Sequence, residues 1–299
     1  VKFQTFRSSL LASKFAKKAS YQMDNELESP NQLTMLEKLE LSKSDHEYLL
    51  RKCKERSIGF FSTAFDLESL DFLNSLKVDR FKVPSGELTN LPYLRRIASY
   101  RKPLIISTGM ATMDEIQEAV KVLKSCGVSN EKITLLHCTS EYPAPFDGVN
   151  LFALQSLRKT FNVEVGYSDH TIGTEVAIAA DALGATVIEK HFTLDCNLQG
   201  PDHAASIMPE ELKSLVVGIR RVQTSLGSVE KIPTEGELKN RLLVRKSIVA
   251  SRPIPEGEML SEVNLTTKRP GTGLSPMLWD QIVGTLALRS FEVDEEIEI

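Results

Sequence analysis

Short apolar stretches alternate with longer amphipathic ones along most of this chain, and that alternation constrains the fold more than any other feature. Seven stretches have the pattern of buried strands, at residues 1–6, 59–62, 80–83, 104–107, 133–137, 163–167 and 185–189. Helical patterns lie between them, at residues 67–76, 90–99, 113–125, 149–161 and 173–183. Strands and helices that alternate at this spacing predict a parallel sheet with right-handed crossovers.

The number of strands favours a closed barrel. A (β/α)8 TIM barrel has one strand more than this count, and the chain opens directly on a strand pattern at Val1 without a starting methionine. We therefore predict an α/β protein with a TIM barrel at residues 1–226, whose first strand and helix precede Val1. Residues 7–32 are polar and irregular in pattern, an excursion of a length that usually serves function. Three further helices are expected at residues 33–41, 45–56 and 210–226.

The end of the chain has a different pattern. Residues 227–245 are polar and contain Gly and Pro, which predicts a linker. Residues 246–299 predict a small β-rich domain, too small to have much core of its own, so we expect it to lean on a neighbour. Its elements are expected to be strands at 247–250, 265–268 and 286–289 and a helical turn at 279–282.

Composition excludes several classes of function. The formal net charge of −4 and the pI of about 5.9 offer no basic face for nucleic acid or an anionic membrane. No apolar run approaches the roughly 18 residues of a membrane helix, and no signal-peptide pattern is present. The four cysteines lack the spacing of zinc or redox sites. These features predict a reduced, cytoplasmic protein.

Two histidines follow the last two predicted strands of the barrel. His170 and His191 are 21 residues apart, and each stands near a carboxylate, Asp169 or Glu189. The carboxyl ends of parallel strands are where α/β enzymes carry their chemistry. We predict that the two imidazoles bind a divalent metal of the hard or borderline class with open coordination positions, rather than structural zinc. The alternative is a pair of hydrogen-bonded structural histidines, and His137 is either a third ligand or a packing residue.

Lysines and hydroxyls at the other strand ends could bind a phosphate. Lys2 and Lys82 each interrupt an otherwise apolar strand, and lysines with Ser and Thr donors suit a phosphate group. The alternative is that both are solvated or paired surface lysines. Glu87 and Glu189 are candidate general acids or bases, or substrate anchors, and Asp202 could accept hydrogen bonds from sugar hydroxyls.

The motifs together resemble one family. They are VKFQTF, STAFD, KVPSGELTN, STGMAT, LLHCTSEYPAP, VGYSDHT, GATVIEKHFTLD, GPDHAAS, RKSIVA and KRPGTGLSP. In this order, and over essentially the whole chain, they closely resemble the sialic acid synthases, which are phosphoenolpyruvate-dependent N-acetylneuraminate synthases and relatives that make other nonulosonic acids. The resemblance implies a (β/α)8 barrel followed by an antifreeze-like (SAF) domain. It also implies a domain-swapped homodimer, in which each SAF domain reaches over the active site of its partner.

The resemblance also implies roles for individual residues. The metal ligands fall on His170 and His191, with manganese expected and magnesium or cobalt as alternatives. The catalytic residues implied are Glu87, Glu189 and His191. The phosphoenolpyruvate contacts fall on Lys2, Thr63, Lys82, Ser85, Ser107, Ser168 and Ser140, where some members have Asn. The contacts to the N-acetylated amino sugar fall on Gln4, Tyr142, Asp202 and an arginine that crosses from the partner, Arg269.

The implied activity is that of a C–C bond-forming transferase. We expect an N-acetylneuraminate synthase that condenses phosphoenolpyruvate with N-acetylmannosamine and releases phosphate. One alternative uses a 2,4-diacetamido sugar and makes legionaminic or pseudaminic acid. Another is a non-catalytic or truncated form, because the family's first strand, with its glutamate, lies upstream of Val1. A metal-dependent hydrolase would not need the two lysines or the C-terminal domain.

Overall fold

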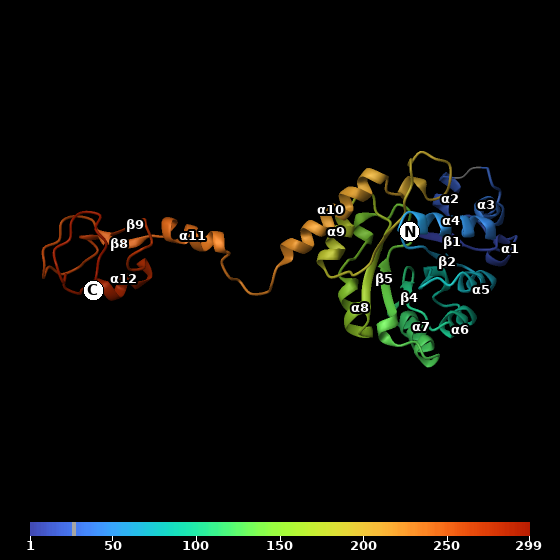
Figure 1. Ribbon diagram of the computed structural model, residues 1–299, viewed down its shortest axis with the longest axis horizontal. Coiled ribbons are helices and arrows are strands. Elements are labelled where there is room, and N and C mark those ends of the chain that lie inside the picture. The colour runs from blue at the N-terminus through green and yellow to red at the C-terminus, as the bar shows by residue number, and fades with distance from the viewer. Residues whose placement is uncertain (26–27) are drawn as a thin grey trace. The chain divides into compact units, whose positions relative to one another are not determined.

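The computed structural model describes residues 1–25 and 28–299. The chain divides into two compact units, Val1–Gly227 and Ser228–Ile299 (Figure 1). Within the described residues, no helix is long and apolar enough to cross a lipid bilayer.

The first unit is built on a seven-stranded sheet in which every strand pairs in parallel with the next one along the chain. The strands are β1 (Lys2–Thr5), β2 (Phe61–Ala64), β3 (Phe81–Val83), β4 (Leu104–Ser107), β5 (Ile133–Cys138), β6 (Glu164–Asp169) and β7 (Ile188–Lys190). Lys2 on β1 and Glu189 on β7 form an ion pair with Nζ and Oε2 3.1 Å apart, so the sheet curves until its two outer strands face each other. The predicted α/β fold of the TIM-barrel type is confirmed.

Helices cover the outer face of this sheet (Figure 1). They are α4 (Lys43–Glu55), α5 (Leu67–Ser75), α6 (Leu91–Ser99), α7 (Met113–Ser125), α8 (Ala153–Phe161), α9 (Glu175–Ala182) and α10 (Pro209–Leu226). In α7 a capping box between Thr112 and Glu115 starts the helix. Ile116, Val120 and Leu123 lie on its buried face, at the spacing of one helical stripe. The core of the unit lies between such stripes and the outward-facing strand residues.

The segment after β1 corrects the prediction that residues 7–32 are irregular. It contains α1 (Ser8–Leu11) and α2 (Ser20–Asn25), and it leads into α3 (Gln32–Leu39). Residues 26 and 27, which lie in the predicted irregular segment, are outside the described residues. Helices of four and six residues are too short to show an apolar periodicity in the sequence.

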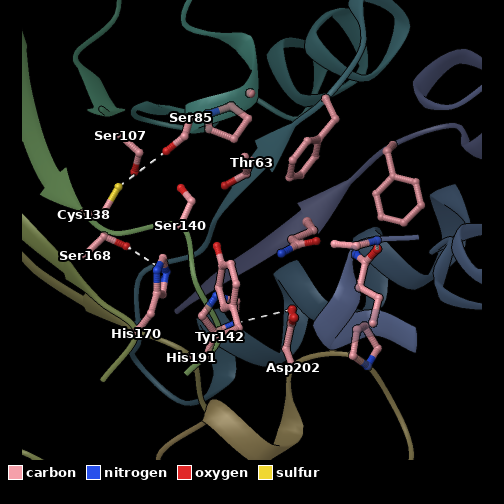
Figure 2. Close-up of a pocket in the computed structure, with 18 of the residues that line it drawn as sticks. Thr63, Ser85, Ser107, Cys138, Ser140, Tyr142, Ser168, His170, His191 and Asp202 are labelled. Carbon is pink, nitrogen blue, oxygen red and sulfur yellow. Dashed lines mark hydrogen bonds and ion pairs between the residues drawn. The ribbon is translucent and has the colours of Figure 1, made fainter. Parts of the chain in front are cut away.

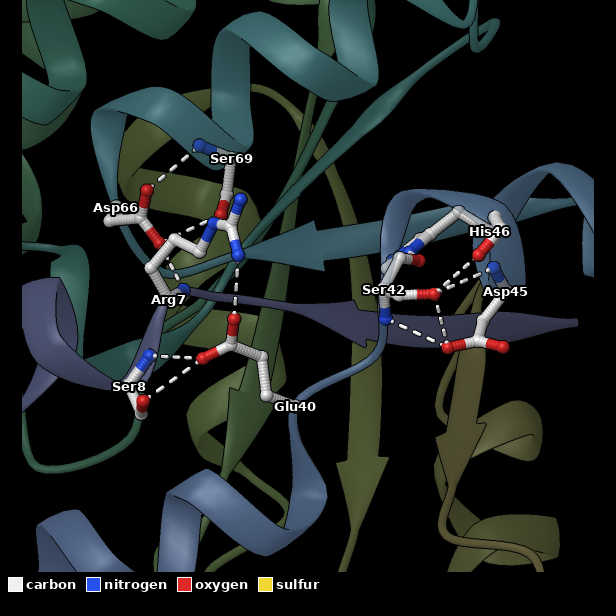
Figure 3. Close-up of polar contacts among 9 residues, drawn as sticks. Arg7, Ser8, Glu40, Ser42, Asp45, His46, Asp66 and Ser69 are labelled. Atoms are coloured by element: carbon white, nitrogen blue, oxygen red, sulfur yellow. Dashed lines mark hydrogen bonds and ion pairs between the residues drawn. The ribbon is translucent and has the colours of Figure 1, made fainter.

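Carboxylates fasten both ends of this segment (Figure 3). Glu40, after α3, accepts hydrogen bonds from the backbone N–H and the hydroxyl of Ser8 at 2.8 and 2.9 Å, and from Arg7 Nη1 at 2.9 Å. Asp66, at the start of α5, accepts from the backbone N–H of Arg7 at 2.9 Å. The start and the end of the helical segment are therefore held together beside the carboxyl end of β1.

The second unit has a core of its own. It contains α11 (Glu235–Val244), the antiparallel pair β8 (Ser247–Ala250) and β9 (Leu265–Lys268), and α12 (Trp279–Ile282). Its buried apolar residues are Ile248, Ala250, Ile254, Leu260, Leu265, Ile282, Ala287, Phe291 and Ile297.

Three features of this part of the chain differ from the expectations. The first is its core, since residues 246–299 were expected to have little core of their own. The predicted linker at 227–245 contains α11, which begins with a capping box between Thr234 and Glu237. The predicted strand at 286–289 is absent, because only Leu286 forms a bridge, with Met259.

Candidate active site

The carboxyl ends of the seven strands open into a cavity of about 470 Å³. Every strand contributes to its lining, through Lys2 and Gln4 on β1, Thr63 on β2, Lys82 on β3, Ser107 on β4, Cys138 on β5, Ser168 on β6 and Glu189 on β7. Figure 2 shows labelled side chains around the cavity, of which Thr63, Ser107, Cys138 and Ser168 lie on strands and the others lie on segments that follow strands. The cavity arises because parallel strands all end at one rim of the barrel.

Most of the predicted site residues lie together in this cavity. They are Lys2, Gln4, Thr63, Lys82, Ser85, Ser107, Ser140, Tyr142, Ser168, His170, Glu189, His191 and Asp202.

Two predicted site residues are not among the lining residues. Glu87 ends the short helix η1 (Ser85–Glu87), and its Oε2 accepts a hydrogen bond from Asn90 Nδ2 at 2.6 Å. Arg269 belongs to the second unit, directly after β9. The structure therefore does not bring Glu87 into the cavity, and the role of Arg269 stays a prediction.

One end of the cavity carries two lysines that share a carboxylate. Lys82 is 2% exposed, and its Nζ donates to Ser107 Oγ at 2.5 Å. Glu189 lies 3.1 Å from Lys2 Nζ and 3.7 Å from Lys82 Nζ, and it accepts from Ser168 Oγ at 2.9 Å. Both lysines are thus paired, but Lys82 is buried and not the surface lysine of the alternative interpretation, and two ammonium groups face a single carboxylate. The residual positive charge suits an anion.

Burial and charge set the ionisation of these groups. Burial lowers the pKa of Lys82 to about 8, although Glu189 favours its charged form. Burial alone would raise the pKa of Glu189, but attraction to Lys82 and Lys2 lowers it to about 2. Glu189 is therefore a carboxylate at neutral pH, while Lys82 lies close to its titration range.

Thr63 supplies an unused hydroxyl to the same end. It is 1% exposed, and its Oγ1 has no hydrogen-bond partner in the part of the chain that the structure describes. A buried hydroxyl without a partner is costly unless a ligand or water satisfies it. An anionic oxygen beside Lys82 would do so.

The two predicted metal ligands lie side by side. The ring centroids of His170 and His191 are 5.4 Å apart. His170 Nδ1 lies 2.6 Å from the carbonyl oxygen of Thr139, so Nδ1–H donates and Nε2 keeps its lone pair. Burial lowers the pKa of His170 to about 4, and burial together with the charge of Lys2 lowers the pKa of His191 to about 4. Both rings are neutral at pH 7, as metal ligands must be.

These donors fit a particular kind of metal site. Within residues 1–25 and 28–299, no group of three or more His, Cys, Asp or Glu side chains has the geometry to hold an ion. Two imidazoles alone could hold a divalent ion whose other positions are filled by water or substrate. An open arrangement of this kind differs from structural zinc, which takes four protein ligands, and its nitrogen donors suit a borderline divalent ion better than magnesium, which prefers oxygen ligands.

His137 lies outside this site. Its Nε2 is 2.6 Å from the carbonyl oxygen of Val149, and its ring lies 6.0 Å from that of Tyr167. It does not line the cavity, and it acts as a packing residue.

Beside the histidines lie two predicted sugar contacts. The ring centroid of Tyr142 is 4.2 Å from that of His170 and 5.6 Å from that of His191. Asp202 Oδ2 lies 3.6 Å from His191 Nδ1 (Figure 2). Burial raises the pKa of Tyr142 and that of Asp202. Both groups face the cavity from the side of the histidines.

A buried ion pair lies behind the histidines. Because neighbouring residues of a strand point to opposite faces, Asp169 and Lys190 face away from the cavity that His170 and His191 line. Lys190 Nζ is 2.8 Å from Asp169 Oδ2, and the two side chains are 4% and 0% exposed. Lys190 also donates to the carbonyl oxygen of Thr171 at 2.6 Å. The pair joins β6 to β7 where the histidines emerge.

Sequence reasoning missed part of the cavity wall. The helical segment after β1 contributes Leu11, Tyr21, Gln22, Gln32, Met35 and Leu36, and β5 contributes Cys138. The length of the segment was a signal that it serves function, but no periodicity identified which of its residues face inward.

Both units of the chain are similar to known protein families. The model of the NeuB family matches residues 1–231, and that of the SAF domain matches residues 245–297. The chain is 52% identical over 297 residues to N,N'-diacetyllegionaminic acid synthase of Campylobacter jejuni, covering 99% of this chain and 89% of that protein. It is 38% identical over 263 residues to N-acetylneuraminate-9-phosphate synthase of Homo sapiens, covering 87% and 72%. The crystal structure of N-acetylneuraminic acid synthetase from Leptospira borgpetersenii, in complex with citrate, is similar with a TM-score of 0.68, 31% identity and coverage of 80% and 78%.

Proposed function

The chain belongs to the NeuB family of nonulosonic acid synthases, and we propose that it condenses phosphoenolpyruvate with a 2,4-diacetamido hexose to make N,N'-diacetyllegionaminic acid and phosphate. Support for this sugar comes from the relatives that carry that name, at 52% and 50% identity. The expectation of N-acetylneuraminate synthesis has weaker support, from a relative at 38% identity. The alternative weighed from the sequence is therefore preferred over the main expectation.

One observation carries the proposal for the chemistry. A positively charged end of the cavity lies beside two neutral histidines, and it contains Lys2, Lys82 and the Thr63 hydroxyl, which has no hydrogen-bond partner among the described residues. The first set suits the phosphate and carboxylate of phosphoenolpyruvate. The second suits a metal that faces a carbonyl group. A condensation between an anionic enol phosphate and an aldehyde needs both, side by side.

The residues of the chain would act mainly by positioning the reactants. Lys2, Lys82 and the hydroxyls hold phosphoenolpyruvate so that its C3 faces the aldehyde carbon of the sugar, and Asp202 accepts hydrogen bonds from sugar hydroxyls. A divalent ion on His170 and His191, for which we propose manganese, supplies Lewis-acid polarisation of the aldehyde oxygen when bound. Attack by C3 forms the C–C bond while the π bond of the aldehyde breaks and its oxygen takes up a proton to become a hydroxyl. Water adds at the electron-deficient C2 and loses a proton, and cleavage of the C2–O bond releases phosphate and leaves the keto group of the product. Positioning and electrostatics are expected to provide most of the rate.

The ionisation of Glu189 favours one of its two predicted roles. A carboxyl whose pKa is about 2 is a poor proton donor at pH 7. Glu189 would therefore anchor Lys2 and Lys82 rather than act as a general acid. Glu87, which is absent from the cavity lining, is not assigned a catalytic step.

Membership of this family also suggests an oligomeric state. We propose a cytoplasmic homodimer in which Arg269 of the partner subunit contacts an N-acetyl group of the sugar. The support is the SAF domain at residues 245–297 together with the family resemblance.

Product analysis tests the proposal. The chain is incubated with phosphoenolpyruvate, manganese and either a 2,4-diacetamido hexose or N-acetylmannosamine, and the products are identified by mass spectrometry. We expect the diacetamido sugar to give the larger kcat/KM. A larger kcat/KM for N-acetylmannosamine would instead support an N-acetylneuraminate synthase. Binding of phosphoenolpyruvate and a sugar without any product would favour the non-catalytic alternative.

A further inference from the structure

The cavity has an apolar end that the condensation itself does not require. Its wall consists of Phe6, after β1, Leu11 on α1, and Met35 and Leu36 on α3. Phe6 is 6% exposed and Met35 is 2% exposed. Together with Gln32 we call these residues the α1–α3 chamber. Phosphoenolpyruvate and a sugar bearing mostly hydroxyls would gain little from such a wall.

Helix α2, which lies between the chamber's helices α1 and α3 in the chain, contacts the side of the cavity that we propose for the sugar. The ring of Tyr21 on α2 lies against that of Tyr142 with centroids 5.0 Å apart, and the ring of Tyr142 lies against that of His170 with centroids 4.2 Å apart, both pairs in a tilted arrangement. Asn25 Nδ2, at the end of α2, donates to the carbonyl oxygen of Pro201 at 3.0 Å, next to Asp202. The helical segment is thus joined to both predicted sugar contacts that flank the histidines.

The α1–α3 chamber also contains a free amide. In the part of the chain that the structure describes, the side-chain amide of Gln32 forms no hydrogen bond, although it lines the cavity. The neighbouring amide of Gln22 is already engaged, since it accepts from the backbone N–H of Ala19 at 3.0 Å and donates to Tyr21 Oη at 3.2 Å. Gln32 can therefore both donate to and accept from a ligand.

An acetamido group matches these features. Its carbonyl and N–H require an acceptor and a donor in one place, and its methyl group requires an apolar wall. The sugar reacts at its aldehyde carbon, so a substituent at C4 lies at the far end from the histidines. N-acetylmannosamine has an acetamido group at C2 and a hydroxyl at C4, and a hydroxyl has no methyl group to place against Leu36.

We propose, resting on the proposed function, that the α1–α3 chamber binds the second acetamido group of the sugar. Gln32 hydrogen-bonds to its amide and Leu36 packs against its methyl group. These two residues determine the preference for a diacetamido sugar over N-acetylmannosamine.

Two substitutions test this inference. Gln32→Leu keeps the size of the side chain but removes the amide, and Leu36→Ala removes part of the apolar wall. Each is expected to weaken the kcat/KM for the 2,4-diacetamido hexose, and its calorimetric affinity in the presence of manganese, by about tenfold. The same parameters for N-acetylmannosamine, and the KM for phosphoenolpyruvate, are expected to change by less than about twofold.

A matched control lies on the same helix. Glu37 on α3 is exposed and does not line the cavity, so Glu37→Gln is expected to behave as the unchanged protein with both sugars. Equal losses for the two sugars in Gln32→Leu and Leu36→Ala, or no loss for either, would overturn the subsite while leaving the proposed function in place. An unchanged protein that prefers N-acetylmannosamine, or binds neither sugar, would overturn both.

Discussion

The two ends of the cavity are built in different ways. The anion end consists of side chains on the strands themselves, such as Lys82 and Ser168, which are held by neighbouring strands and by one another. The end that we propose for the sugar is closed by the short helices α1, α2 and α3, which lie outside the sheet and attach to it and to neighbouring loops through contacts such as those of Asp66 with Arg7 and of Asn25 with Pro201. Side chains that contact the reacting atoms need fixed positions, which the strands of the sheet provide. A short helical segment outside the sheet can accept substitutions without disturbing the strands.

The largest effect is expected at the rigid end. Lys82→Met removes a buried charge beside the position that we propose for the phosphate and leaves Glu189 with one ammonium partner. We expect kcat/KM for phosphoenolpyruvate to fall by about 100- to 1000-fold in a phosphate-release assay. Lys121→Met, an exposed lysine on α7, is the control and should match the unchanged protein. A loss of less than tenfold in Lys82→Met would contradict the assignment of the anion end.

The buried pair behind the histidines should dominate stability in the same region. Lys190→Met leaves the carboxylate of Asp169 buried without its partner, which is expected to lower the free energy of unfolding by about 3–5 kcal/mol in chemical denaturation. Lys52→Met breaks an exposed pair with Glu55 and should have no measurable effect.

The double variant Lys190→Met with Asp169→Leu removes both charges, and it should recover part of the loss. A loss in the double variant equal to that in Lys190→Met would show that packing, rather than the unpaired carboxylate, is responsible.

The pKa of Lys82 predicts how anion binding depends on pH. A pKa of about 8 means that Lys82 is mostly charged at pH 7 and mostly neutral at pH 9. If the charged form binds, the Kd for phosphoenolpyruvate should rise by about tenfold between pH 7 and pH 9, measured by calorimetry. Lys82→Arg keeps its charge throughout and should flatten the profile. If the Kd of the unsubstituted protein does not change with pH, the ionisation of Lys82 does not control phosphoenolpyruvate binding.

The smallest effect is expected at the helical end. Asn25→Ala removes the single hydrogen bond to Pro201, so the KM for the sugar is expected to rise by about threefold while kcat stays unchanged. The KM for phosphoenolpyruvate is the internal control. If the KM values for the sugar and for phosphoenolpyruvate rise together, then a change in the helical segment also affects the anion-binding residues on the strands.

The same contrast explains what could be predicted from the sequence. The strand ends were identifiable because a buried apolar run followed by polar residues marks the rim of a barrel, which is how Thr63, Ser168 and His191 were found. The sequence did not show which side chains of the loop after a strand point into the cavity. The short turn η1 takes Glu87 toward Asn90, while Ser85 at its start lines the cavity.

Tertiary context decided the remaining differences. The helices α1 and α2 have too few turns to show a periodicity, and α11 lies in a stretch whose Gly and Pro suggested a linker. Residues 286–289 have a strand-like composition, but among residues 1–25 and 28–299 their one bridge is that from Leu286 to Met259, so no ladder forms there. The chamber residue Gln32 could not be singled out, because its free amide is a property of the folded surroundings.

The carboxylate that Lys2 and Lys82 share has a consequence for selectivity. It cancels one of the two positive charges, so a small monovalent anion such as chloride finds only a modest attraction in the cavity. A ligand carrying several negative charges can engage both ammonium groups and outweigh the resident carboxylate. Glu189 should therefore reduce the competition of chloride with a multiply charged anion for this end of the cavity.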